Sequence, residues 1–282
     1  MNTNRSSDSN PRDGAFTLLE LLVVIGMVGL WALMLVPALA RTAVRNPALQ
    51  CMNNLQQLQR ASAMYAADNN GRLAANLGSF LYSFNAWCTG VLDWGQGYGA
   101  GSLGESVPPN LNTNYLLNAQ LGPYTGSRAS VYKCPADKAS SAVGPRVRSY
   151  SMNGFVGGTA EQSVYGYTTY RTFLKDSDFT APGPAKTFVF IDEHPDSIND
   201  CMLGMHMPAA TVWPSYATWV DVPASYHNGA GALSFVDGHV EVHKWLDTNT
   251  LCPIQKFSPA LATGTTSAQD NAWLVARTSA PN

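Results

Sequence analysis

The sequence has few charged residues and no concentration of positive charge. Asp, Glu, Lys and Arg make up 13% of its 282 residues, about half of the ~25% that is usual in globular proteins. The 17 Lys and Arg nearly balance the 19 Asp and Glu, so the formal net charge is -2. Proteins that bind a nucleic-acid backbone carry clustered Lys and Arg. Nucleic acid is therefore not an expected partner.

Familiar catalytic motifs are also missing. The sequence contains neither a G-x-S-x-G elbow nor an H-E-x-x-H pair. The glycine-rich segment 97–101 lacks the preceding strand and following helix that a phosphate-binding loop needs. We therefore expect no catalytic residues and no enzyme activity.

The cysteines lack the paired C-x-x-C spacing of zinc knuckles and thioredoxin-type motifs, so neither is supported. In an oxidising compartment the five cysteines would form at most two disulfides, which leaves one free thiol. The five residues are Cys51, Cys88, Cys134, Cys201 and Cys252.

Residues 16–40 form a long hydrophobic run that is interrupted only by Glu20 and Pro37. About 20 helical residues, rising ~1.5 Å each, cross a hydrocarbon core of ~30 Å. We therefore expect a transmembrane helix here. An ionised Glu20 inside a bilayer would cost at least ~2.5–3.5 kcal/mol, so it needs a partner.

The segment 15–25 (AFTLLELLVVI) resembles the cleavage and methylation motif of type IV pilins and type II secretion pseudopilins. The resemblance implies that prepilin peptidase cuts between Ala15 and Phe16 and methylates the new amine of Phe16. It also implies that Glu20 pairs with such an amine during assembly. Ala15 departs from the family pattern, because Gly usually precedes the cut and Gly14 lies one place too early.

The resemblance also implies a location and partners. The chain would be a single-pass inner-membrane protein, with its C-terminal domain in the periplasm or, after assembly, at the cell surface. Its partners would be prepilin peptidase, other pilin-like subunits, the assembly platform of a secretion or pilus machine, and the inner membrane. Two alternatives remain, a secretory signal peptide cut after Ala38-Leu39-Ala40 and a plain signal anchor.

An amphipathic helix is predicted from Pro47 to Asp68. Asn46-Pro47 has the composition of an N-cap and first helical position, and Gly71 is a typical stop. Pro47 also predicts a break from the preceding helix. The domain organisation expected is a leader at 1–15, the hydrophobic helix at 16–40, a stem helix at 41–70 and a globular domain at 71–282.

The globular domain contains four strand candidates and one clear hairpin, in which Asp237-Gly238 forms the tight turn. The fold class expected is α+β and pilin-like, with a long N-terminal hydrophobic helix and a stem packed on a loop-rich antiparallel sheet. The strand candidates are 149–152, 187–192, 232–236 and 239–245.

Further strings resemble a pilin-like family of undefined function from planctomycete and verrucomicrobial bacteria. They run most of the length of the chain, and the last is a His-x9-Asp-Gly signature formed by His227, Asp237 and Gly238. The others are CMNNLQQL at 51–58, CPAD at 134–137 and SYSMNG at 149–154.

A metal site is one hypothesis for the residues near this signature. His227, Asp237, His239 and His243, together with the segment 192–194 (DEH), offer nitrogen and carboxylate ligands for zinc. The alternative is that Asp237-Gly238 only forms a turn and that His227 hydrogen-bonds the hairpin. The acidic segments 192–193 and 196–200 are candidates for calcium. No other cofactor is expected.

The resemblance implies that the protein functions as a pilin-like (pseudopilin) structural subunit of a type II secretion or type IV pilus-like assembly. One alternative is a membrane-anchored binding module for carbohydrate, built on exposed tryptophans, although burial of these rings in the core is the more ordinary account. Another is a metal-dependent hydrolase at His227 and Asp237. The tryptophans concerned are Trp87, Trp94, Trp213 and Trp219.

Overall fold

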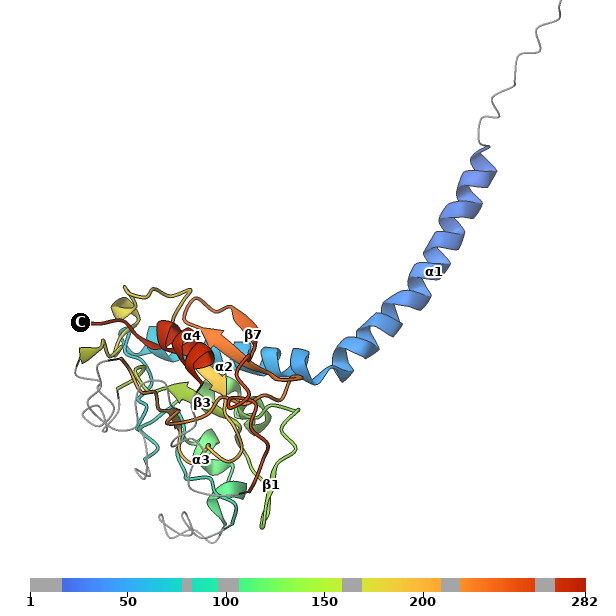
Figure 1. Ribbon diagram of the computed structural model, residues 1–282. Helices are drawn as coiled ribbons and strands as arrows, with labels where there is room; N and C mark the ends of the chain where they lie inside the picture. Colours follow the sequence, from blue (N-terminus) through green and yellow to red (C-terminus); the bar gives the residue numbers. More distant parts are fainter. Residues whose placement is uncertain (1–16, 78–82, 96–106, 159–168, 209–218, 257–266) are drawn as a thin grey trace, which may run out of the picture. The chain divides into compact units, whose positions relative to one another are not determined.

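The computed structural model describes six stretches of the chain (Figure 1). The chain divides into two compact units, Met1–Asn46 and Pro47–Asn282. The described stretches are 17–77, 83–95, 107–158, 169–208, 219–256 and 267–282.

The first unit contains helix α1 (Leu18–Arg45). A capping box sets its beginning. The Thr17 N–H donates to Glu20 Oε2 (2.9 Å), and the Glu20 N–H donates to Thr17 Oγ1 (3.3 Å). Each side chain thereby satisfies a backbone donor that a helix N-terminus leaves free.

The expectation of a long membrane-spanning helix at 16–40 is wrong. Within the described part of the chain, no helix combines the length and the apolar character that a membrane crossing requires. This finding also contradicts the single-pass inner-membrane location and the assignment to membrane secretion.

The second unit begins with helix α2 (Pro47–Asp68), which confirms both the predicted helix and the break before Pro47. Asn70 and Gly71 end it in left-handed backbone conformations, with φ of 56° and 76°. Its apolar face includes Cys51, Leu55 and Leu58, which are fully buried. This face packs against the main sheet, where α2 contacts β4, β6 and β7.

The main sheet has five strands in the order β5-β3-β4-β6-β7. It is mixed, because β5 runs parallel to β3 whereas the other neighbours are antiparallel. The expected all-antiparallel sheet is therefore wrong. Four of the strands lie where the sequence predicts them, and the two-residue β5 was missed because it is too short to show a period. The strands are β3 (Tyr150–Asn153), β4 (Phe188–Asp192), β5 (Met202–Leu203), β6 (Ala230–Phe235) and β7 (Val240–Lys244).

The predicted hairpin is confirmed as β6 and β7, with Ser234 opposite Val240. Its turn is wider than the two-residue Asp-Gly turn expected. Only Gly238 has a positive φ (93°), and Phe235 bonds to His239 across the turn through its N–H (3.0 Å).

Helix α4 (Ala268–Thr278) was not predicted. Its own N-cap residue makes no side-chain cap hydrogen bond. Asp247, which lies beyond β7, caps it instead by accepting the N–H groups of Gln269 and Asp270 (both 3.0 Å). Because this cap comes from a distant part of the chain, local sequence does not reveal it.

Short elements complete the second unit. They include a two-stranded antiparallel sheet and single turns of helix on the loops. The sheet is β1 (Ser140–Ser141) and β2 (Gly144–Pro145), and the helical turns are η1 (Pro109–Leu111), α3 (Asn114–Leu117), η2 (Pro123–Thr125), η3 (Ala129–Tyr132) and η5 (Asp176–Asp178).

Candidate metal centre

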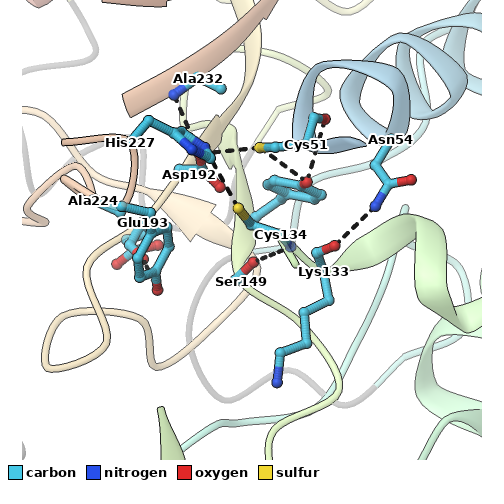
Figure 2. A network of polar contacts seen from close by, with 12 residues as sticks. Cys51, Asn54, Lys133, Cys134, Ser149, Asp192, Glu193, Ala224, His227 and Ala232 are labelled. Carbon is cyan, nitrogen blue, oxygen red and sulfur yellow. Dashed lines mark hydrogen bonds and ion pairs between the residues drawn. The ribbon is translucent and has the colours of Figure 1, made fainter. Parts of the chain in front are cut away.

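Four potential metal ligands from four separate segments meet beneath α2 (Figure 2). Cys51 lies on the first turns of α2 and Cys134 just after η3, while Asp192 ends β4 and His227 lies in the loop before β6. Their ligand atoms all lie within 4.8 Å of one another, and theirs is the single such group of three or more in the described part of the chain. We call it the Cys-Asp-His cluster; its members are Cys51, Cys134, Asp192 and His227.

Three of the distances inside the cluster are close to those of a tetrahedral site, and all of its ligand atoms lie within 4.8 Å of one another. Asp192 Oδ2 lies 3.3 Å from Cys51 Sγ and 3.2 Å from His227 Nε2. The same His227 nitrogen lies 3.5 Å from Cys134 Sγ. Zinc bonds of ~2.0–2.3 Å in a tetrahedron place ligand atoms roughly 3.3–3.8 Å apart. The four atoms therefore need little movement to share one ion.

The cluster is buried and held by a surrounding layer of hydrogen bonds. Cys51, Cys134 and Asp192 are 0% exposed, and the His227 side chain is 4% exposed. The Tyr150 hydroxyl donates to Cys51 Sγ (3.3 Å) and the Ala232 N–H donates to Asp192 Oδ2 (3.2 Å). Such outer contacts orient metal ligands.

The protonation of the cluster is set by mutual contacts. Burial lowers the pKa of His227, but the contacts with Asp192 and Cys134 outweigh it and raise the pKa to about 10. The contact with Cys51 lowers the pKa of Cys134, whereas burial raises that of Cys51 well above its usual value. Asp192 Oδ1 is buried and has no hydrogen-bond partner among the described residues. Such a group is costly to bury unless a cation offsets its charge.

Only one member of the predicted set His227, Asp237 and His239 lies in this cluster. Asp237 and His239 contact each other in the hairpin turn (Oδ1 to Nδ1, 2.5 Å), where their side chains are 37% and 41% exposed. Asp237 and Gly238 therefore form part of the hairpin turn, as the alternative to a metal site expected. The His227 N–H bonds to Ala230 O at the start of β6 (3.1 Å), as the turn alternative expected, while its ring lies in the Cys-Asp-His cluster.

The acidic segment considered for calcium uses its carboxylates as acceptors for backbone amides. Asp196 Oδ2 accepts the Gln255 N–H (2.6 Å), and Asp200 Oδ1 accepts the Met202 N–H (2.7 Å). Both residues are buried. Glu193 accepts hydrogen bonds from Ser151 and Ser197, and burial raises its pKa to about 8.

The remaining sequence candidates fall elsewhere. Ala15, Phe16 and Trp213 lie outside the described residues. Glu20 is exposed in the first turn of α1 and contacts Thr17. His243 stacks on Trp273, with ring centroids 3.5 Å apart. Three tryptophans are buried in the core, as the ordinary account expected, namely Trp87, Trp94 and Trp219.

The sequence pointed to all four cluster members without joining them. Cys51 and Cys134 begin two of the strings that carry the family resemblance, His227 begins the signature, and Asp192 belonged to the metal hypothesis. The intervals of 83, 58 and 35 residues between successive members (134 − 51, 192 − 134 and 227 − 192) follow no known ligand spacing. The absence of C-x-x-C pairs therefore did not reveal that two of the cysteines lie in one group of potential ligands. One signal in the sequence could have indicated the cluster: three of the strings that carry the family resemblance each begin with a potential metal ligand.

The comparisons with known proteins add no family. No protein-family model matches the chain, and neither a curated protein nor a solved structure is detectably similar to it.

Proposed function

We propose that this protein is a structural subunit of a type IV pilus-like assembly, in which helices α1 of several copies pack together. The observation that carries the proposal is the exposure of α1. Every side chain described from Leu18 to Leu33 is exposed, and large hydrophobic residues occur on all sides of the helix. A helix that is apolar all round needs cover on every side. A bundle of identical helices gives that cover.

Glu20 fits a role in such a bundle. Hydrogen bonds from Thr17 lower the pKa of its exposed carboxyl group, so Glu20 is ionised at neutral pH. An ionised carboxylate inside an apolar bundle needs a positive partner. Cleavage before Phe16 by prepilin peptidase, which the sequence resemblance implies, would create that partner as a new terminal amine.

The second unit supports a structural role over the two alternatives. The Cys-Asp-His cluster already contains four protein ligands, whereas catalytic zinc sites keep one position for water or substrate. This disfavours a hydrolase. Burial of Trp87, Trp94 and Trp219 removes three of the four rings on which a carbohydrate surface was considered.

The proposal is tested by measuring assembly of the full chain with light scattering and negative-stain microscopy. Leu22→Lys and Ile25→Lys place a charge on the exposed face of α1 and are expected to reduce assembly to monomers. Leu246→Lys is the matched control, because Leu246 is also exposed (66%) but lies in the second unit. A wild-type chain, matured to Phe16, that stays monomeric at all concentrations would contradict the proposal.

A further inference from the structure

We infer that one structural Zn²⁺ ion binds at the Cys-Asp-His cluster, with one ligand atom from each of Cys51, Cys134, Asp192 and His227. The site lies within the second unit, so zinc binding does not depend on how α1 assembles.

The choice of zinc follows from the donor atoms. Two sulfur atoms, one imidazole nitrogen and one carboxylate oxygen form a mixed set that suits zinc, whereas Ca²⁺ and Mg²⁺ prefer oxygen ligands alone. When zinc binds, each cysteine releases its proton, the His227 ring releases the proton on Nε2, and the two thiolates offset the charge of the ion. The carboxylate of Asp192 and the neutral ring of His227 complete four-coordination.

The surroundings are already arranged for an ion. Tyr150 donates to Cys51 Sγ, and the Ala232 N–H fixes the Asp192 carboxylate from the side of β6. The Cys134 N–H donates to Ser149 Oγ (2.7 Å), which holds the loop after η3 in place. An open groove has Cys134 in its lining; its other lining residues are Gln50, Asn53, Asn54, Ser130, Lys133 and Pro135.

A structural role follows from the burial and from the origin of the ligands. Because four protein atoms fill the coordination shell, the ion has no free position for a substrate. The ligands come from α2, the loop after η3, β4 and the loop before β6. The ion would therefore join the stem helix to the sheet and to two loops, and its binding free energy would add to the stability of the second unit.

The first measurement is the zinc content of the purified full chain by elemental mass spectrometry, followed by replacement with Co²⁺. We expect one equivalent of zinc. We also expect a Co²⁺ spectrum with the thiolate charge-transfer bands and the intense visible bands of a tetrahedral site. Removal of the ion with a chelator should lower the midpoint of thermal unfolding, and added Zn²⁺ should restore it.

Variants then locate the ion. Cys134→Ser and His227→Ala should lose the bound zinc and the cobalt spectrum. Cys252→Ser and His239→Gln are matched controls outside the cluster and should keep both. If the cluster variants fail to fold, the wild-type measurements still decide the question.

Three results would overturn the inference. One is a wild-type chain that holds no zinc and gives no cobalt spectrum in metal-replete conditions. Another is zinc that persists in folded Cys134→Ser and His227→Ala. The third is a disulfide between Cys51 and Cys134, detected by mass mapping of the unreduced chain, because a disulfide would consume both sulfur ligands.

Discussion

At the scale of single residues, one pair of substitutions can separate the capping role of Glu20 from the role that we propose for its charge. Glu20 caps α1 through Thr17, and we propose that its charge pairs with an amine in the assembly. Gln at this position can keep the capping box but removes the charge. Val removes both.

We therefore expect Glu20→Gln to keep the helix content of the wild type, measured by circular dichroism, while assembly decreases. Glu20→Val should lose assembly and also fray the first turn of α1. If Glu20→Gln assembles as well as the wild type, Glu20 acts only as a cap and the proposed charge pairing is wrong.

A second pair of cysteines is placed to form a disulfide. The sulfur atoms of Cys88 and Cys201 lie 2.7 Å apart, and the residues are only 1% and 6% exposed. A small shift would bring them to the S–S bond length of about 2.05 Å. Burial raises the pKa of the Cys88 thiol well above its usual value, so oxidation is expected to be slow in the folded chain.

Refolding with oxidised glutathione should therefore link Cys88 to Cys201. The two thiols lose two protons and two electrons, which reduce one glutathione disulfide to two thiols. Peptide mass mapping should show the linked pair, and the bond should add roughly 2–4 kcal/mol to the free energy of unfolding. Cys252→Ser should leave the result unchanged, whereas a link from Cys88 to Cys252 would refute the pairing.

Asp221 makes the stability of the second unit depend on pH. Burial, followed by the nearby charges of Glu193 and Asp200, raises its pKa well above the usual value. Its oxygens accept the Gly204 N–H (2.5 Å) and the Ser197 hydroxyl (3.5 Å). The folded chain thus keeps this carboxyl group protonated at pH values where the unfolded chain has lost the proton.

The folded state therefore binds more protons than the unfolded state above about pH 4, the usual pKa of Asp. The contribution of Asp221 to stability falls as the pH rises, by up to about 1.4 kcal/mol per pH unit, until its folded-state pKa is passed. Asp221→Asn removes this dependence, so the variant should gain stability relative to the wild type as the pH rises in urea titrations. Glu241→Gln on the edge strand β7 is the control. An unchanged difference from pH 5 to 8 would argue against a protonated Asp221.

At the scale of elements, α2 is expected to contribute more to stability than any loop, because its apolar face covers the main sheet. Leu58 is fully buried in that face, whereas Leu49 on the same helix is 42% exposed. Leu58→Ala leaves a cavity and should lower the free energy of unfolding by ~2–5 kcal/mol. Leu49→Ala should change it by less than ~0.5 kcal/mol. Urea unfolding followed by tryptophan fluorescence measures both, and equal effects would contradict the packing described.

The elements also show where prediction from sequence succeeds. The helix at Pro47–Asp68 and the hairpin of β6 and β7 were predicted because their stop signals and periodic patterns are local. The two-residue β5 and the externally capped α4 were missed, because a neighbouring strand in one case and Asp247 in the other stabilise them.

At the scale of the whole molecule, the two units should be separable. Trypsin can cut after Arg45, just before the second unit begins at Pro47. We expect the released second unit to keep its circular dichroism spectrum and its bound zinc but to stay monomeric, because it lacks α1. A fragment that unfolds on release would show that the units depend on each other, and one that still assembles would contradict a role for α1.

The local features of this protein follow from short stretches of its sequence. The apolar character of α1, its Thr17–Glu20 cap, the limits of α2 and the β6–β7 hairpin all depend on residues that are close together in the chain. Interactions over a few residues act in any context, so they can be recognised before the fold is known. The same local view failed for the membrane-spanning helix, because no helix in the described part of the chain has the length and apolar character of one.

Which distant residues meet depends on the folded arrangement of the whole second unit. The parallel pairing of β5 with β3 and the convergence of Cys51, Cys134, Asp192 and His227 depend on how the chain returns to α2. Ligands separated by 35 to 83 residues (227 − 192 and 134 − 51) leave no periodic trace. Their proximity follows from packing of the sheet against the stem helix, which is a property of the folded chain as a whole.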